Sequence, residues 1–114
     1  MGKVGIIKLT QRMLTKSIID ANKSVVAFAN EILPVDYGHI ENGKKARFFA
    51  VFDDGSASEL RLYRRPRGDE LLSIKGLSKK AKAGDIVKLT RYSGEDPKVR
   101  VKITVEEEVN EEEN

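Results

Sequence analysis

The stretch ARFFAVFDDGSASELRLY, residues 46–63, contains two strand-like runs joined by a turn. Residues 46–52 are rich in aromatic and β-branched side chains, and residues 59–63 alternate leucines with charged residues. Such runs on either side of Asp53-Asp54-Gly55 are typical of a β-hairpin. We therefore predict two paired strands here, with residues 70–74 returning as a third strand.

The rest of the chain carries further strand patterns. Residues 4–9 form an apolar run, and VRVKITV, residues 99–105, alternates apolar with polar side chains. This period of two predicts that Val99, Val101, Ile103 and Val105 point inward. We expect residues 85–92 and 99–105 to form a hairpin around the turn 93–97.

One helix is predicted with clear limits. Asn22 is a suitable N-cap, Pro34 ends the pattern, and the apolar residues between them form one stripe: Val25, Val26, Ala29, Ile32 and Leu33. Residues 15–21 suit either a short strand or a helical turn, and residues 76–82 predict a single helical turn closed by Gly84.

These elements predict a mainly β fold with one or two helices (α+β), namely a small open β-barrel. The 114 residues suffice for one domain, which we assign to residues 1–105. The chain has no cysteine, no apolar run long enough to cross a membrane and no secretion signal at its start. We therefore expect no membrane association and a cytoplasmic location.

The charge is distributed unevenly. Residues 106–114, EEEVNEEEN, hold six acids and no base, whereas residues 1–105 hold 21 bases and 12 acids, a net charge of +9. We predict that this acidic tail is disordered. Two roles stay open for it: a solubilising end, or a nucleic-acid mimic that competes for the basic body.

Basic residues gather in one part of the chain. Residues 61–82 hold eight bases and two acids, and Lys44, Lys45 and Arg47 open the preceding strand. Arginine binds phosphate with two parallel hydrogen bonds and also reads guanine in the major groove. A local excess of one charge sign repels itself, so the cluster indicates a polyanionic partner.

Catalytic signals are weak by comparison. His39 has no second histidine or cysteine with which to form a metal or acid–base site. Asp85, Asp96 and Lys98 follow the order of a metal-dependent nuclease, but Asp96 precedes a proline in a turn. We predict a non-enzymatic protein without a metal or other cofactor.

Four segments carry a resemblance to a known family: TKSIIDANKSVVAF (15–28), VDYG (35–38), NGKKARFFAVF (42–52) and LYRRPRGDELLSIKGLSKKAKAGDIVKL (62–89). Together they resemble the DNA-recognition domain of type II restriction endonucleases. The order of elements is also similar to the DNA-binding pseudobarrel of the EcoRII N-terminal effector domain and the plant B-three transcription factors. No nuclease domain follows these segments, so cleavage is not implied, and the chain is expected to be an excised recognition domain or a free-standing relative.

The resemblance implies an open barrel of about seven strands with two arms that enter the major groove of double-stranded DNA. The arginine turn at residues 64–69 suits one arm and residues 8–16 the other. The expected DNA-binding residues are Gln11, Arg12, Lys16, Lys44, Lys45, Arg64, Arg65, Arg67, Lys79 and Lys80. Of these, Gln11, Arg12 and Arg67 are expected to read bases and the others to bind phosphates.

Other partners stay open. An RNA-binding small barrel fits the same charge, although single-strand recognition favours exposed aromatic rings and most of the seven aromatic residues lie at positions expected to point inward. A protein-interaction module with an acidic partner is a third candidate, and a nuclease domain or subunit is a further candidate partner.

Overall fold

The computed structural model describes residues 3–32, 45–66 and 69–107. The strands are β1 (Gly5–Lys8), β2 (Ile19–Asp20), β3 (Lys45–Phe52), β4 (Ala57–Arg64), β5 (Glu70–Ile74), β6 (Ile86–Arg91) and β7 (Val99–Glu106). The helices are α1 (Gln11–Lys16), α2 (Lys23–Ile32) and the short 3-10 helix η2 (Leu77–Lys79).

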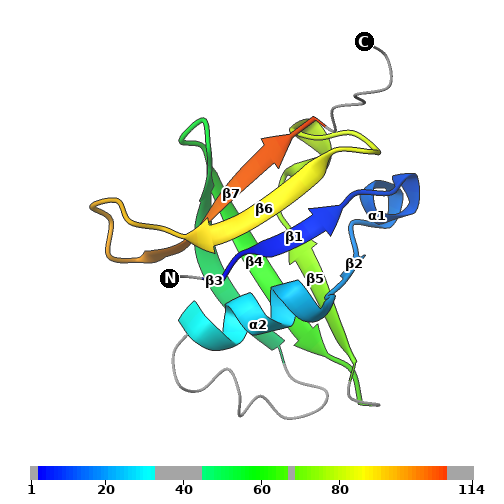
Figure 1. Ribbon diagram of the computed structural model, residues 1–114, viewed down its shortest axis with the longest axis horizontal. Helices are drawn as coiled ribbons and strands as arrows, with labels where there is room; N and C mark the ends of the chain where they lie inside the picture. The colour runs from blue at the N-terminus through cyan, green and yellow to red at the C-terminus, as the bar shows by residue number, and fades with distance from the viewer. Residues whose placement is uncertain (1–2, 33–44, 67–68, 108–114) are drawn as a thin grey trace.

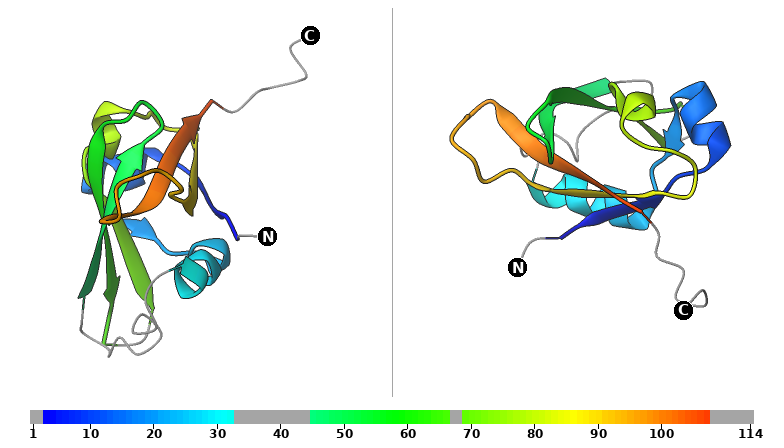
Figure 2. Two further views of the ribbon diagram at one scale, coloured as in Figure 1. Left: turned by 90° about the vertical axis from the view of Figure 1, so that its left-hand side faces the viewer. Right: turned by 90° about the horizontal axis from the view of Figure 1, so that it is seen from above.

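All seven strands belong to one sheet in the order β1-β6-β7-β3-β4-β5-β2. The sheet curls into an open half-barrel (Figures 1 and 2). Neighbouring strands are antiparallel, except that β3 and β7 are parallel. The prediction of a mainly β, small open barrel is confirmed.

Strand pairing follows the predicted hairpins. Strand β3 pairs with β4 from Lys45 opposite Tyr63 to Val51 opposite Ala57, and β5 returns along β4. Strand β6 pairs with β7 over its whole length. Strand β7 ends at Glu106, one residue beyond the predicted domain boundary, and residues 108–114 of the predicted tail lie outside the described residues.

The core lies inside the curl. Because strand side chains alternate between faces, every second residue of the central strands is buried, including Leu60, Leu62, Val87, Leu89, Val101 and Ile103. Val105 is half-buried and packs against this core, so the inward direction predicted for Val101, Ile103 and Val105 is confirmed. Val99 is half-buried and pairs with the exposed Phe49 of β3.

Helix α2 covers one side of this core and packs against β1 and β6 (Figure 1). Its N-terminus is capped as predicted, since the Asn22 side-chain oxygen accepts a hydrogen bond of 3.1 Å from the Val25 amide. Val25, Phe28 and Ala29 are buried. Leu33 and Pro34, which the sequence assigned to the helix end, lie outside the described residues.

The turn from η2 into β6 is held by local geometry. Gly84 has a φ of 95°, which side-chain-bearing residues rarely adopt, and the Asp85 carboxylate accepts a hydrogen bond of 3.0 Å from the Lys82 amide. In residues 3–32, 45–66 and 69–107, no helix combines the length and apolar character that crossing a bilayer requires.

Candidate functional site

Helix α1 occupies the segment that the sequence predicted as an arm. Thr10 caps it in an extended conformation, and its hydroxyl accepts a hydrogen bond of 3.2 Å from the Met13 amide. The helix ends at Ser17, which has a left-handed backbone (φ 56°, ψ 30°), and β2 follows. The sequence allowed either a short strand or a helical turn for residues 15–21. In the structure this segment contains both the end of α1 and the whole of β2.

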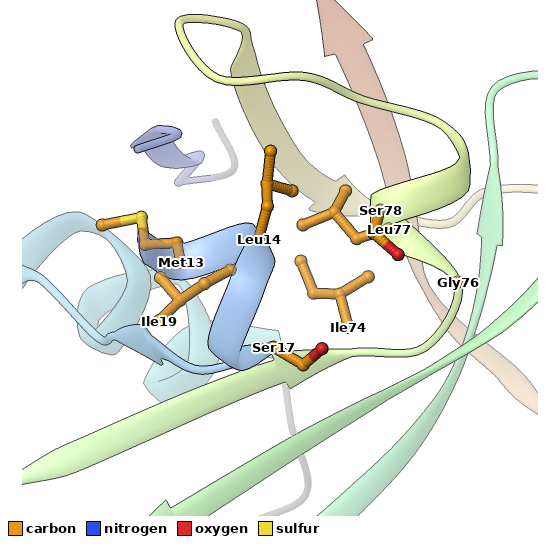
Figure 3. A pocket seen from close by; sticks show the side chains of 8 residues that line it. All are labelled: Met13, Leu14, Ser17, Ile19, Ile74, Gly76, Leu77 and Ser78. Atoms are coloured by element: carbon orange, nitrogen blue, oxygen red, sulfur yellow. The ribbon is translucent and has the colours of Figure 1, made fainter. Parts of the chain in front are cut away.

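Apolar contacts fix α1 to the barrel. Met13 and Leu14 of α1 face Ile19, Ile74 and Leu77 around a small cavity of about 40 Å³ (Figure 3). This packing joins α1 to β5 and η2, which lie more than fifty residues later in the chain. With its apolar side held in this way, α1 leaves Gln11, Arg12 and Lys16 exposed to solvent.

A groove runs between α1 and the segment that follows β4, and we call it the α1 groove. It has a volume of about 500 Å³ and is lined by Thr10, Arg12, Met13, Lys16, Ile18, Asp20, Arg65 and Leu71. Residues 10–20 therefore meet Arg65 and Leu71 at one site. Thr10, Arg12, Met13 and Lys16 belong to one of the two predicted arms, and Arg65 belongs to the other.

Arg65 is the most constrained cation of this groove. Its Nη2 lies 2.6 Å from Asp69 Oδ2 and 3.6 Å from Asp20 Oδ1, and its side chain is 32% exposed. Its Nε is buried and has no hydrogen-bond partner among the described residues. Arg12 and Lys16 form no ion pair with any of the described residues, so the groove keeps an excess of positive charge.

Arg64 lies on the other face of β4. It stands opposite Glu70 on the side that carries Leu60 and Leu62, and its Nη2 is 2.8 Å from Glu70 Oε1. Only 23% of the Arg64 side chain is exposed. Arg65 follows the last residue of β4 and pairs with Asp69 and Asp20, whereas Arg64 pairs with Glu70, so the two guanidinium groups have different partners.

A second groove lies between the β3–β4 hairpin and the segment from the end of β5 to η2, and we call it the β3–β5 groove. It has a volume of about 360 Å³ and is lined by Phe49, Phe52, Ser56, Ala57, Ser58, Glu59, Lys75, Gly76, Lys79 and Lys80. Lys80 Nζ lies 2.5 Å from Asp54 Oδ2 and 5.6 Å from the Phe52 ring centroid. Hydrogen bonds from Lys80 and Ser56 hold the pKa of Asp54 well below its usual range.

Eight of the ten expected DNA-binding residues lie in the part of the chain that the structure describes, and they are distributed over several sites. Arg12, Lys16 and Arg65 line the α1 groove, whereas Lys79 and Lys80 line the β3–β5 groove. Neither groove is lined by the other three described residues: Gln11 donates a hydrogen bond to Thr15, Lys45 lies 5.7 Å from the Tyr63 ring centroid, and Arg64 pairs with Glu70. Lys44 and Arg67 lie outside the described residues.

The sequence analysis missed the exposed aromatic ring of Phe49, which is 56% accessible. The run ARFFAVF has no clear alternation, so the sequence did not show which of Phe48 and Phe49 points inward. The pairing of β3 with β4 shows which of the two rings points away from the core. Phe48 stands opposite buried Leu60, and Phe49 opposite Glu59.

Asp85, Asp96 and Lys98, which follow the order of a metal-dependent nuclease, lie on either side of β6 in the chain. Asp85 precedes β6 and is buried in its turn, whereas Asp96 lies in the loop beyond the other end of that strand and accepts a hydrogen bond from the Lys98 amide. Among residues 3–32, 45–66 and 69–107, no three histidine or acidic side chains lie close enough to hold a metal ion. His39 lies outside these ranges.

Comparison with known proteins adds no assignment: no family model matches the chain, and no curated protein matches it.

Proposed function

We propose that this protein is a non-catalytic module that binds double-stranded DNA through the α1 groove. The observation that supports this best is the meeting of Arg12, Lys16 and Arg65 at one groove from two distant parts of the sequence. Such convergence of cations on a concave surface suits a phosphate backbone. The resemblance to restriction-endonuclease recognition domains points to the same partner.

The lining of the α1 groove favours a duplex over a single strand. It contains no aromatic side chain on which an unpaired base could stack. Its cations are carried by a helix and by an arginine held in place by Asp69, and such groups suit contacts with phosphates at fixed positions. In this proposal Arg12, Lys16 and Arg65 bind phosphates, and Gln11 at the start of α1 contacts base edges.

Binding to DNA in the cytoplasm fits the sequence expectation, and a separate nuclease domain or subunit is a candidate partner. Cleavage by this chain is no part of the proposal.

A titration of a labelled duplex, followed by fluorescence anisotropy over a salt series, tests the assignment. We expect Arg12→Ala with Lys16→Ala to weaken binding to every duplex. Each lost phosphate contact removes about 0.9 from the slope of log K against log salt, so the slope should become shallower by about 2. Both side chains are exposed, so the double variant should unfold like the wild type.

The matched control is Arg91→Ala with Lys98→Ala. These exposed cations flank the β6–β7 turn, which lies at the far end of the molecule from α1 (Figures 1 and 2). The control removes the same charge and should leave the slope nearly unchanged. Equal losses in the two double variants would show that net charge alone attracts DNA and would remove the α1 groove from the assignment.

A further inference from the structure

The outer face of the β3–β4 hairpin alternates aromatic and basic side chains. Its register places Lys45 opposite Tyr63, Arg47 opposite Arg61, and Phe49 opposite Glu59. All six residues belong to the face that points away from the core, because the intervening positions carry Leu60, Leu62 and Ala50, which are buried. Two aromatic rings therefore flank a pair of arginines.

Phe49 is the exposed end of this array. Its side chain is 56% accessible and lines the β3–β5 groove together with Lys75 and Lys79. Neither lysine forms an ion pair with a carboxylate among the described residues. The Lys75 charge acts on the Glu59 carboxylate, which lines the same groove, without forming an ion pair with it. An exposed ring beside these two ammonium groups offers a stacking surface and, next to it, a site for negative charge.

Glu59, the acidic residue of this array, already pairs with two arginines. Glu59 Oε1 lies 3.0 Å from Arg61 Nε and 3.3 Å from Arg47 Nε, while the two arginine side chains stay 57% and 67% exposed. One carboxylate thus orients two guanidinium groups and leaves most of their donors open to solvent. The face is positively charged beside its aromatic rings.

We propose that this face binds single-stranded nucleic acid, with a base stacked on Phe49 and the adjoining phosphates bound by Lys75, Lys79 and Arg47. Stacking on an aromatic ring requires an unpaired base, which a closed duplex does not present. An acidic peptide would match the charge, but it has no need of a flat ring between cations. The sequence analysis expected most of the seven aromatic residues to point inward, and Phe49, the residue that this site requires, is one that does not.

The site is independent of the α1 groove. The two grooves have no lining residue in common: Leu71 of β5 lines the α1 groove, whereas Lys75, which follows β5, lines the β3–β5 groove. Loss of duplex binding by the α1 variants would therefore leave this proposal intact, and the reverse also holds.

The test is anisotropy titration of labelled oligothymidylate and oligouridylate of about 12 nucleotides, within the range that a small barrel covers. Loss of one stacked base is worth about 1–3 kcal/mol, so Phe49→Ala should weaken binding about 5- to 150-fold. Phe49→Trp should bind at least as well as the wild type. Phe49→Leu keeps the apolar surface but loses the ring, and it should weaken binding nearly as much as Phe49→Ala.

Two further variants sharpen the result. Ile6→Ala removes an apolar side chain of similar exposure, 47%, from β1 and should bind like the wild type. Glu59→Gln releases Arg47 and Arg61 from their shared carboxylate and should strengthen binding. Comparison of the two oligonucleotides shows whether DNA or RNA is the better ligand.

Three outcomes would overturn the proposal. The first is no saturable binding of either oligonucleotide at low salt. The second is wild-type binding by Phe49→Ala. The third is wild-type binding by Phe49→Leu, which would identify the face as an apolar contact surface for a protein.

Discussion

The side-chain amide nitrogen of Asn22 lies 2.8 Å from the backbone carbonyl oxygen of Ile6, so the residue that caps α2 also binds the edge of the sheet. Ser24 completes this contact, because its hydroxyl accepts a hydrogen bond of 2.9 Å from the Ile6 amide. Strand β1 ends the strand order, and its outward backbone groups would otherwise lack a strand partner. The start of α2 therefore closes one edge of the open barrel.

Replacement of Asn22 tests this closure. Asn22→Ala should lower the free energy of unfolding by about 1–2 kcal/mol, because it removes the helix cap and the shorter of two hydrogen bonds to the Ile6 carbonyl, which then keeps only the 3.2 Å bond from the Ser24 hydroxyl. Asn22→Asp keeps the capping oxygen and loses only the donor, so its loss should be smaller. Urea unfolding followed by circular dichroism measures both. A change for Asn22→Ala within about 0.5 kcal/mol, as for an ordinary surface substitution, would contradict the closure.

A second prediction concerns the end of α1. Ser17 holds a left-handed conformation with φ at 56° and ψ at 30°, which costs a residue with a side chain about 1–2 kcal/mol. Glycine adopts this conformation readily but loses more entropy on folding. Ser17→Gly should therefore raise the free energy of unfolding by up to about 1 kcal/mol. Ser17→Ala, which keeps the Cβ, should give no gain in the same unfolding experiment, and an equal gain would exclude the backbone explanation.

The strands and α2 were predictable because each carries its own periodicity. VRVKITV buries alternate residues on a single inner face, and the stripe from Val25 to Ala29 follows one side of a helix. Turn residues such as Gly84 were predictable because their backbone geometry depends on local chemistry. In these elements the local pattern and the tertiary packing agree.

The α1 helix and the grooves were not predictable, because they depend on contacts between distant segments. Six residues are too few for a stable isolated helix, and α1 relies on Ile74 and Leu77 for its packing. The sequence analysis also grouped Arg64 with Arg65, although in the structure Arg64 pairs with Glu70 and Arg65 with Asp69 and Asp20. The resemblance did suggest that residues 8–16 and the arginine turn work together, and the α1 groove brings parts of both segments to one place.

Removal of Leu77 tests the dependence of α1 on its packing. Leu77 is 6% exposed and faces Leu14 of α1 across the small cavity in Figure 3. Leu77→Ala should cost about 2–5 kcal/mol of unfolding free energy. It should also speed amide hydrogen exchange in residues 11–16 more than in β6. Leu71→Ala, at a half-buried leucine, should cost less, and unchanged exchange in α1 would show that the helix is held by other contacts.

The last prediction concerns Glu59 and acid stability. The hydrogen bond from Arg61, and then the charges of Arg61 and Arg47, hold the pKa of Glu59 below its usual range. A carboxylate whose pKa falls on folding stabilises the protein fully above its unfolded pKa of about 4.3. That stabilisation is lost as the pH falls from there through the lower folded pKa, because the folded state must then take up a proton that the unfolded chain already carries.

Glu59→Gln should therefore make the free energy of unfolding less dependent on pH below about 4.3. NMR titration of the Glu59 carboxyl carbon measures the pKa directly. Arg61→Ala should raise that pKa toward its ordinary value, and Arg47→Ala should raise it less, because Arg61 donates the hydrogen bond that contributes most. An ordinary pKa for Glu59 in the wild type would show that the two arginines do not share this carboxylate in solution.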